Sequence, residues 1–264
     1  MGKHKIALLD AHAQNYIHTV MSEQLHRGGY ANKGGKVFHW YRVVDDAVLQ
    51  TVYFYTQWKA MPIFMSIGYG CHPLFIPPEY PSGIQVSMQR SYEVVNPGRV
   101  IGKRGQNISN SIFSPEAAVM CPNDQFRGAD ILTSVLELQN GIRSIEQCYA
   151  MHKQRHIDAA EQLRLPSQET FRRVSVDFMT EAAYFNDTEL FPVFIPRINS
   201  EIDRYTKAQA SRSLWNIEKY ELQAYLQLKK AVIEQQREDF LAYLQERQTN
   251  NTIMLKRKVK DIIL

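Results

Sequence analysis

The chain has 264 residues, of which 44% are hydrophobic and 22% are charged, so it can bury one large core or two modest ones. An aromatic content of 11% argues against disorder, and no apolar run approaches the ~20 residues of a membrane-spanning helix. The three cysteines are odd in number, so disulfides cannot pair all of them, and they are widely spaced, so the sequence holds no CxxC zinc motif. These features favour a globular protein of the reducing cytoplasm.

Turn-forming and basic residues are unevenly distributed along the chain. Every glycine lies at or before Gly141, and no proline follows Pro196. Because these residues break regular structure most strongly, we expect a turn-rich first part and a helix-rich second part. Thirteen basic and nine acidic residues follow Pro196, which accounts for the whole net charge of +4. We favour the interpretation that these basic residues lie on a solvated helix end. The alternative is that they contact nucleic acid or an acidic partner.

Apolar patterns in the first part predict a helix followed by an antiparallel sheet. Three- and four-residue steps from Leu9 to Leu25 give one helical stripe. The β-branched and aromatic segments 36–44 and 48–58 flank an Asp-Asp turn and predict a hairpin, and 61–70 predicts a third strand. Segment 84–94 alternates between apolar and polar residues, which is typical of a sheet with one covered face and one wet face.

The second part of the chain shows helical periodicity. Apolar stripes run through 132–163 and 171–185, each with the spacing of a single helix. Pro192 and Pro196 are expected to break the segment that follows. Beyond them, the sequence predicts one long helix over Arg212–Gln248.

The predicted fold class is therefore α+β. An N-terminal helix packs on an antiparallel sheet, and a mostly α-helical C-terminal half with a long helix follows. We expect an α+β domain over residues 1–112 and a helical region over residues 113–264.

The start of the chain has a distinctive order of elements: a helix, a Gly-Gly-Tyr turn, an aromatic hairpin and a wet-faced strand. The residues that carry this order are Leu25–Tyr30, Phe38, Trp40, Arg42 and Val48–Gln57. Over residues 9–95 it resembles a bacterial α+β domain family of unknown function. The resemblance implies an α+β fold and supplies no catalytic residues.

Segment 100–108, Val-Ile-Gly-Lys-Arg-Gly-Gln-Asn-Ile, is the sharpest motif. Its loop residues Gly102, Lys103, Arg104 and Gly105 resemble the GXXG signature of K-homology domains. The resemblance implies a nucleic-acid clamp, in which the glycines admit a nucleotide backbone and the basic side chains supply charge. The flanks argue against it, because an Asn-Pro-Gly before the loop and an early proline after it leave no room for the two helices of such a domain. A surface loop is therefore favoured.

Two pairs of residues are candidates for metal or nucleophilic chemistry. His152 and His156 are four apart on a predicted helix and could form half of a metal site, but their otherwise apolar stripe favours packing. Cys71 and His72 are neighbours on a strand and point to opposite faces, which argues against a nucleophile and its base. The sequence holds no GxSxG, Walker or HExxH motif. We predict no metal, no cofactor and no catalytic residue.

The candidates for binding a partner protein are Tyr53 and Tyr55 of the hairpin, and Leu228 and Val232 of the long helix. Tyrosines on an open sheet can stack on bases or form an interface, although a cover of C-terminal helices is favoured here. A helix without glycine or proline often presents an apolar stripe to a partner. The basic candidates for nucleic-acid contact, besides the loop, are Lys256, Arg257 and Lys258.

We therefore expect a non-enzymatic cytoplasmic binding or interaction protein, such as a subunit of a bacterial complex. It would bind a protein partner or self-associate through its C-terminal helices, and it would not contact a membrane. One alternative is a nucleic-acid-binding protein that uses the 102–105 loop and the basic tail. The other is an enzyme whose dispersed site leaves no local motif; a pocket where histidine, cysteine and carboxylates converge would favour it.

Overall fold

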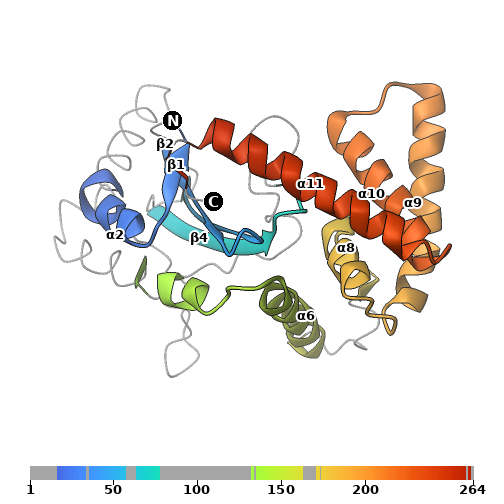
Figure 1. Ribbon diagram of the computed structural model, residues 1–264, viewed down its shortest axis with the longest axis horizontal. Helices are drawn as coiled ribbons and strands as arrows, with labels where there is room; N and C mark the ends of the chain where they lie inside the picture. The colour runs from blue at the N-terminus through green and yellow to red at the C-terminus, as the bar shows by residue number, and fades with distance from the viewer. Residues whose placement is uncertain are drawn as a thin grey trace. The chain divides into compact units, whose positions relative to one another are not determined.

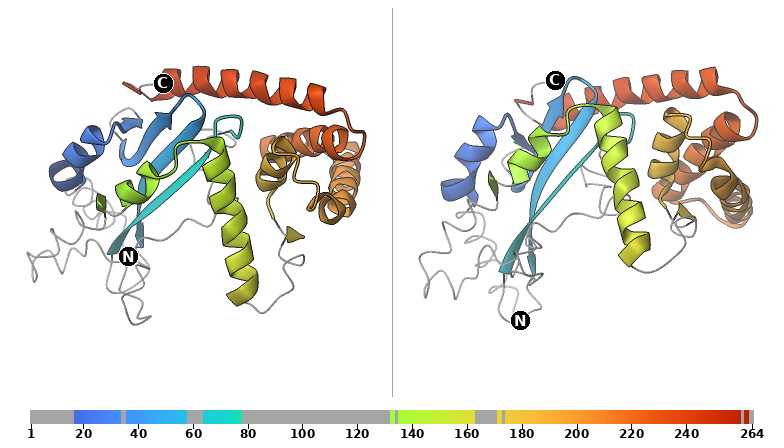
Figure 2. Two further views of the ribbon diagram at one scale, coloured as in Figure 1. Left: turned by 60° about the horizontal axis from the view of Figure 1, so that its bottom comes forward. Right: turned by 90° about the horizontal axis from the view of Figure 1, so that it is seen from below.

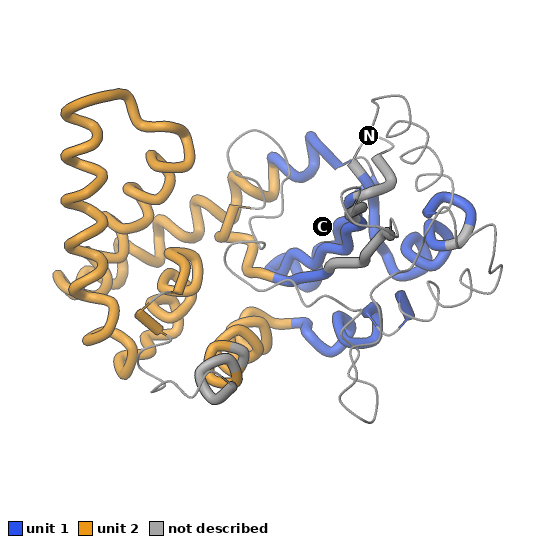
Figure 3. Tube along the Cα trace, turned by 180° about the vertical axis from the view of Figure 1, so that it is seen from behind, with its two compact units in different colours: residues 1–71, 94–143, 254–264 blue, residues 72–93, 144–253 orange. Residues whose placement is uncertain are grey.

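The computed structural model of the chain (Figure 1) divides into two compact units, each discontinuous in sequence, which Figure 3 shows in different colours. Unit 1 comprises Met1–Cys71, Val94–Arg143 and Met254–Leu264, and unit 2 comprises His72–Glu93 and Ser144–Ile253. The residues that the structure describes are 17–33, 36–57, 64–77, 132–133, 135–162, 171–172, 174–259 and 261–262. The predicted strand 84–94, the 102–105 loop and the expected boundary at residue 112 lie outside them.

The first part of the chain forms a four-stranded antiparallel sheet in the order β1-β2-β3-β4 (Figure 2). The strands are β1 (Ala31–Lys33), β2 (Lys36–Val44), β3 (Val48–Gln57) and β4 (Phe64–Pro73). The predicted hairpin is confirmed, with Val44 opposite Val48 next to the turn. Asp45 and Asp46 turn the chain with φ of 50° and 53°, a left-handed conformation that short polar side chains tolerate. The third predicted strand, 61–70, is observed three residues later.

The predicted N-terminal helix is present over the described residues, and its apolar stripe is buried. The side chains of Ile17, Met21 and Leu25 are fully buried and belong to the core of unit 1. The helical segments are η1 (Ile17–Met21) and α2 (Ser22–Arg27). The other members of this core are Tyr30, Trp40, Val52, Phe54, Tyr69, Leu132, Val135 and Leu136.

A buried polar network ties the helical residues 135–140 to the sheet. The Gln139 side-chain amide donates to the carbonyls of Thr51 and Gly70, at 3.0 and 2.9 Å. Its oxygen accepts the Tyr30 hydroxyl at 2.6 Å, and its backbone carbonyl accepts the Gln50 amide at 2.7 Å. Burial raises the pKa of Tyr30, so its phenol stays a donor. One Gln139 side chain therefore joins carbonyls of the two neighbouring strands β3 and β4.

The described helices of the second part share a core in unit 2. They are α6 (Ile145–Gln162), α8 (Val176–Tyr184), α9 (Phe191–Ser211), α10 (Asn216–Val232) and α11 (Arg237–Lys258). Helix α8 is buried from Val176 to Ala183, and the Ser175 hydroxyl caps it by accepting the Phe178 N–H at 3.2 Å. Helices α9 and α10 lie side by side (Figures 1 and 2). Prominent core residues are Phe75, Phe178, Phe194, Ile198, Leu228, Phe240 and Leu244.

The predicted long helix over Arg212–Gln248 is wrong in its continuity, because α10 and α11 replace it. The chain leaves helical geometry between them, where Gln235 has a φ of 58°. This turn lets Leu228 of α10 and Leu244 of α11 reach the same core. Burial of both apolar stripes therefore overrides the absence of glycine and proline.

Two further helix boundaries differ from the prediction. The stripe over 132–163 is interrupted after Asn140, and α6 starts only at Ile145. In the opposite sense, Pro192 and Pro196 do not break the following segment, because both lie within α9. Pro192 is in the first turn, where no backbone hydrogen bond is lost, and Pro196 forfeits a single i→i−4 bond.

Candidate functional site

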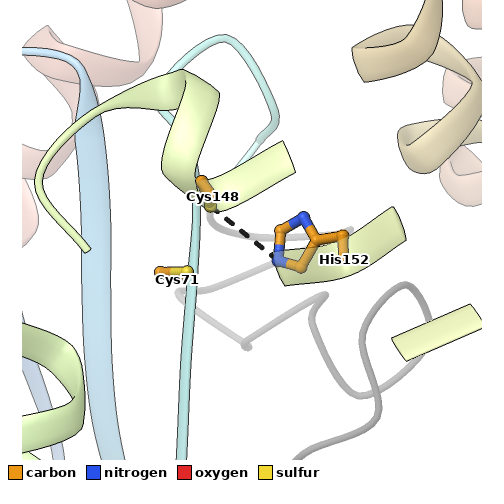
Figure 4. A group of neighbouring side chains, drawn as sticks. All are labelled: Cys71, Cys148 and His152. Carbon is orange, nitrogen blue, oxygen red and sulfur yellow. Dashed lines mark hydrogen bonds between the residues drawn. The ribbon is translucent and has the colours of Figure 1, made fainter. Parts of the chain in front are cut away.

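A thiol, an imidazole and a carboxylate meet inside unit 2. Cys148 and His152 are one turn apart on α6 and project from the same face (Figure 4). The Cys148 Sγ lies 3.8 Å from the His152 Nε2, and the His152 Nδ1 lies 2.8 Å from the Glu181 Oε2 of α8. All three side chains are buried. We call these residues the thiol–imidazole cluster.

The carboxylate fixes how the imidazole can act. With Nδ1–H donated to Glu181, the Nε2 of His152 presents its lone pair toward the thiol. A thiol, an imidazole and a carboxylate in this order can share a proton, activate a thiolate or hold a soft cation. Glu181 and Cys148 have no exposed surface, so solvent does not reach the cluster in this conformation.

A second polar network surrounds the other buried carboxylate of α8. Asp177 lies one turn before Glu181 and accepts the Tyr220 hydroxyl at 2.5 Å. Arg247 lies over the Tyr220 ring, 4.8 Å from its centroid, and donates to the Tyr243 hydroxyl at 3.0 Å. Burial and the Asp177 charge raise the pKa of Tyr220 well above its ordinary value, so its hydroxyl remains a donor. The network supplies Asp177 with a hydrogen bond and a nearby cation.

His72 is a buried histidine that does not belong to either group. Its Nδ1 lies 3.0 Å from the carbonyl of Pro73, and its Nε2 has no hydrogen-bond partner among the described residues. Burial lowers the pKa of His72, and the Pro73 carbonyl and Asp177 act in the opposite direction. The ring is therefore neutral near pH 7.

Because the folded-state pKa of His72 lies below its ordinary value of 6.5, we expect this residue to make stability depend on pH. The unfolded chain takes up the proton first as pH falls, so stability is fully present above about pH 6.5 and decreases below it. His72→Asn should reduce that decrease in urea titrations at pH 7.5, 6.0 and 5.0. Replacement of the exposed His18 with Asn serves as the control. An unchanged pH dependence in His72→Asn would contradict this assignment.

The predicted partner-binding residues whose side chains the structure describes are buried. Leu228 and Val232 are buried in the core of unit 2. Tyr53 is buried in β3, with its ring 6.3 Å from that of His39. Tyr55 also lies in β3, but its side chain is not among those that the structure describes. These three described side chains therefore contribute to packing.

The predicted nucleic-acid residues fall into two groups. Gly102, Lys103, Arg104 and Gly105 lie outside the described residues, so the loop stays a prediction. The basic tail occupies the last turn of α11, where cations also suit the helix dipole. Of its members, the exposed ones are Lys256 and Arg257, and the half-buried one is Lys258.

An exposed corner, which was not among the sites predicted from the sequence, lies between α9 and α10. Trp215 is 71% exposed, although tryptophan is usually well buried. Glu218 accepts the Trp215 backbone N–H at 2.8 Å and two Arg212 hydrogen bonds at 2.8 and 2.6 Å. The Arg212 guanidinium lies 5.4 Å from the Trp215 ring centroid. We call Arg212, Trp215 and Glu218 the Trp215 corner.

Hydrogen bonds hold this corner in place. The Arg212 guanidinium and the Trp215 backbone N–H lower the pKa of Glu218 to about 2, so its carboxylate is charged at neutral pH. The sequence signal was Glu218, three residues after the N-cap residue Trp215, which is half of a capping box. The corresponding signal for the thiol–imidazole cluster was Cys148, four residues before His152 on the same predicted helix.

Comparisons with protein-family models, with curated proteins and with solved structures find no match for this chain. The resemblance of residues 9–95 to a bacterial domain family therefore stays a prediction. Among the described residues, no helix combines the length and the apolar character needed to cross a bilayer.

Proposed function

We propose that the protein is a non-enzymatic binding protein that docks a protein partner through the Trp215 corner. The observation that carries this proposal is the 71% exposure of Trp215 beside an arginine. Tryptophan and arginine are the side chains that most often dominate the binding energy of protein interfaces. A large aromatic surface left in water is costly, and a partner that covers it recovers that cost.

The corner is also preorganised. Two hydrogen bonds join Arg212 to Glu218, and Glu218 holds the backbone at Trp215. The helices on either side are anchored in the core of unit 2 by Tyr205 and Tyr225, whose rings stack 6.4 Å apart. A contact residue that is already held in place loses little conformational entropy on binding. This favours recognition of a partner surface by a rigid corner.

Replacing the anchor should abolish binding without unfolding the protein. We expect Trp215→Ala to change stability by only about 0.5 kcal/mol, because the side chain is exposed. It should weaken partner affinity by about 30-fold or more, as expected for an interface anchor worth about 2 kcal/mol. Partners captured from the host with the wild-type chain would be purified and titrated against both forms. Lys219→Ala, one turn further along α10 and also exposed, is the matched control.

Equal affinity of wild type and Trp215→Ala for every purified partner would contradict the proposal. Loss of binding in Lys219→Ala alone would contradict it as well, because it would place the contact elsewhere on α10.

The two alternative functions are nucleic-acid binding and catalysis. Nucleic-acid binding depends on the 102–105 loop, which lies outside the described residues. Catalysis would need a substrate to reach reactive groups, and the cysteine, histidine and carboxylate that converge in unit 2 are buried. The exposed corner therefore supports binding more directly than either alternative.

A further inference from the structure

We propose that Cys148 and His152 bind a divalent cation of the zinc class inside unit 2. Zinc bonds to cysteine sulfur at about 2.3 Å and to histidine nitrogen at about 2.0–2.1 Å. In a tetrahedral site these bonds place the two ligand atoms about 3.6 Å apart. The 3.8 Å between Cys148 Sγ and His152 Nε2 is close to that separation (Figure 4). One helical turn of α6 therefore sets two corners of a zinc tetrahedron.

Glu181 supplies the support that a histidine ligand requires. Metal-binding histidines commonly donate their second ring N–H to a carboxylate, which fixes the ring and increases the basicity of the ligand nitrogen. His152 is held in this way, with its Nδ1 2.8 Å from the Glu181 Oε2. The ligand types also select the cation, because thiolate and imidazole favour zinc over magnesium or calcium.

The charges of the cluster balance when a dication is bound. A Cys148 thiolate and the Glu181 carboxylate contribute two negative charges, and both groups are fully buried. Buried anions are stable only when they are paired, and a divalent ion supplies two positive charges next to them. On binding, the thiol proton is released to solvent and the Sγ–metal bond forms, so no oxidant or reductant is involved. The neighbouring carboxylate, Asp177, remains bonded to Tyr220.

Cys148 and His152 would supply two of the four ligands of a tetrahedrally coordinated zinc ion. The zinc site rests on α6 and α8 and does not depend on the role of the Trp215 corner, so either proposal can fail alone.

Metal analysis and cobalt titration of the full chain test the site. We expect about one zinc per purified chain, and about one cobalt per apo chain with the near-ultraviolet absorption of a thiolate-to-cobalt charge transfer. Cys148→Ser should abolish that absorption, and His152→Gln should abolish stoichiometric binding. Glu181→Gln should weaken metal affinity by about 10- to 100-fold. His156→Gln is the matched control, because His156 is on the same helix but packs on Phe178, 4.7 Å between centroids.

Circular dichroism establishes that each variant is folded. If a variant fails to fold, the wild-type titration still decides, because zinc should raise its melting temperature in a concentration-dependent way. Cobalt binding without thiolate charge transfer, or no stoichiometric binding by the wild type, would overturn the proposal. Either result would leave Cys148 as a thiol hydrogen-bonded to the His152–Glu181 pair.

Discussion

Glu181→Leu is expected to lower the free energy of unfolding of unit 2 by about 1.5–3 kcal/mol, the usual contribution of a hydrogen bond to a charged group. The loss follows because His152 and Glu181 have fully buried side chains and face each other at 2.8 Å. Leucine leaves the Nδ1 of His152 without its acceptor in an apolar surrounding. Hydrogen exchange of α8 amides would measure the loss.

The control is Glu146→Leu, because Glu146 is exposed on α6. It should change stability by no more than about 0.5 kcal/mol. If Glu181→Leu costs no more than this control, the pair is not a stabilising element of the core. Glu181→Gln, which keeps an oxygen acceptor, should cost less than leucine.

Gln139→Leu is expected to destabilise unit 1 by about 2–4 kcal/mol, because several buried polar groups lose their partner at once. The Gln139 amide donates to the carbonyls of Thr51 and Gly70, and its oxygen accepts the Tyr30 hydroxyl. Leucine has a similar volume, so the effect measures hydrogen bonding more than packing. Hydrogen exchange of the β3 amides should accelerate by the factor that corresponds to this loss of free energy.

Local exchange is the appropriate measurement here, because a chain with two compact units need not unfold in a single transition. The exposed neighbour Glu137 provides a control, since Glu137→Gln should leave exchange of β3 unchanged. Equal exchange rates in Gln139→Leu and the wild type would show that the network does not hold the sheet.

The elements that could be predicted from the sequence are those defined by local patterns. The hairpin was recognisable because two β-rich segments flank Asp45 and Asp46, which tolerate the left-handed turn. The helix that ends near Gly28 was recognisable from its stripe, and Ile17, Met21 and Leu25 are indeed buried. In both cases neighbouring residues contain the whole signal.

The elements that could not be predicted depend on tertiary packing. Gln235 adopts a left-handed conformation because α10 and α11 both contribute to one core. No neighbouring residue type predicts a turn at this position. Pro196 is accommodated inside α9, where the nearby residues Phe194 and Ile198 are buried in the core. The expectation that glycine and proline mark helix ends was therefore wrong in two ways: a helix ends near Gln235 without either residue, and a helix continues through Pro196.

The candidate sites were missed for a related reason. The thiol–imidazole cluster joins residues of α6 to Glu181, and the sequence does not say which helices pack together. The four-residue spacing of Cys148 and His152 was visible in the sequence. Its chemical significance depends on Glu181, which lies beside the His152 Nδ1 and comes from another helix. Trp215 was equally visible as a residue, whereas its exposure is a property of the folded unit.

Photocrosslinking from position 215 in the host cell tests most directly whether the Trp215 corner docks a partner protein. A photoreactive aromatic amino acid, which keeps a large ring at the anchor position, would replace Trp215 in one chain and the exposed Lys219 in another. If the Trp215 corner docks a partner, illumination should attach a defined protein to the chain labelled at 215, and Arg212→Ala in that chain should reduce the yield. No specific adduct at 215, or the same adducts at the same yield from 219, would contradict the account.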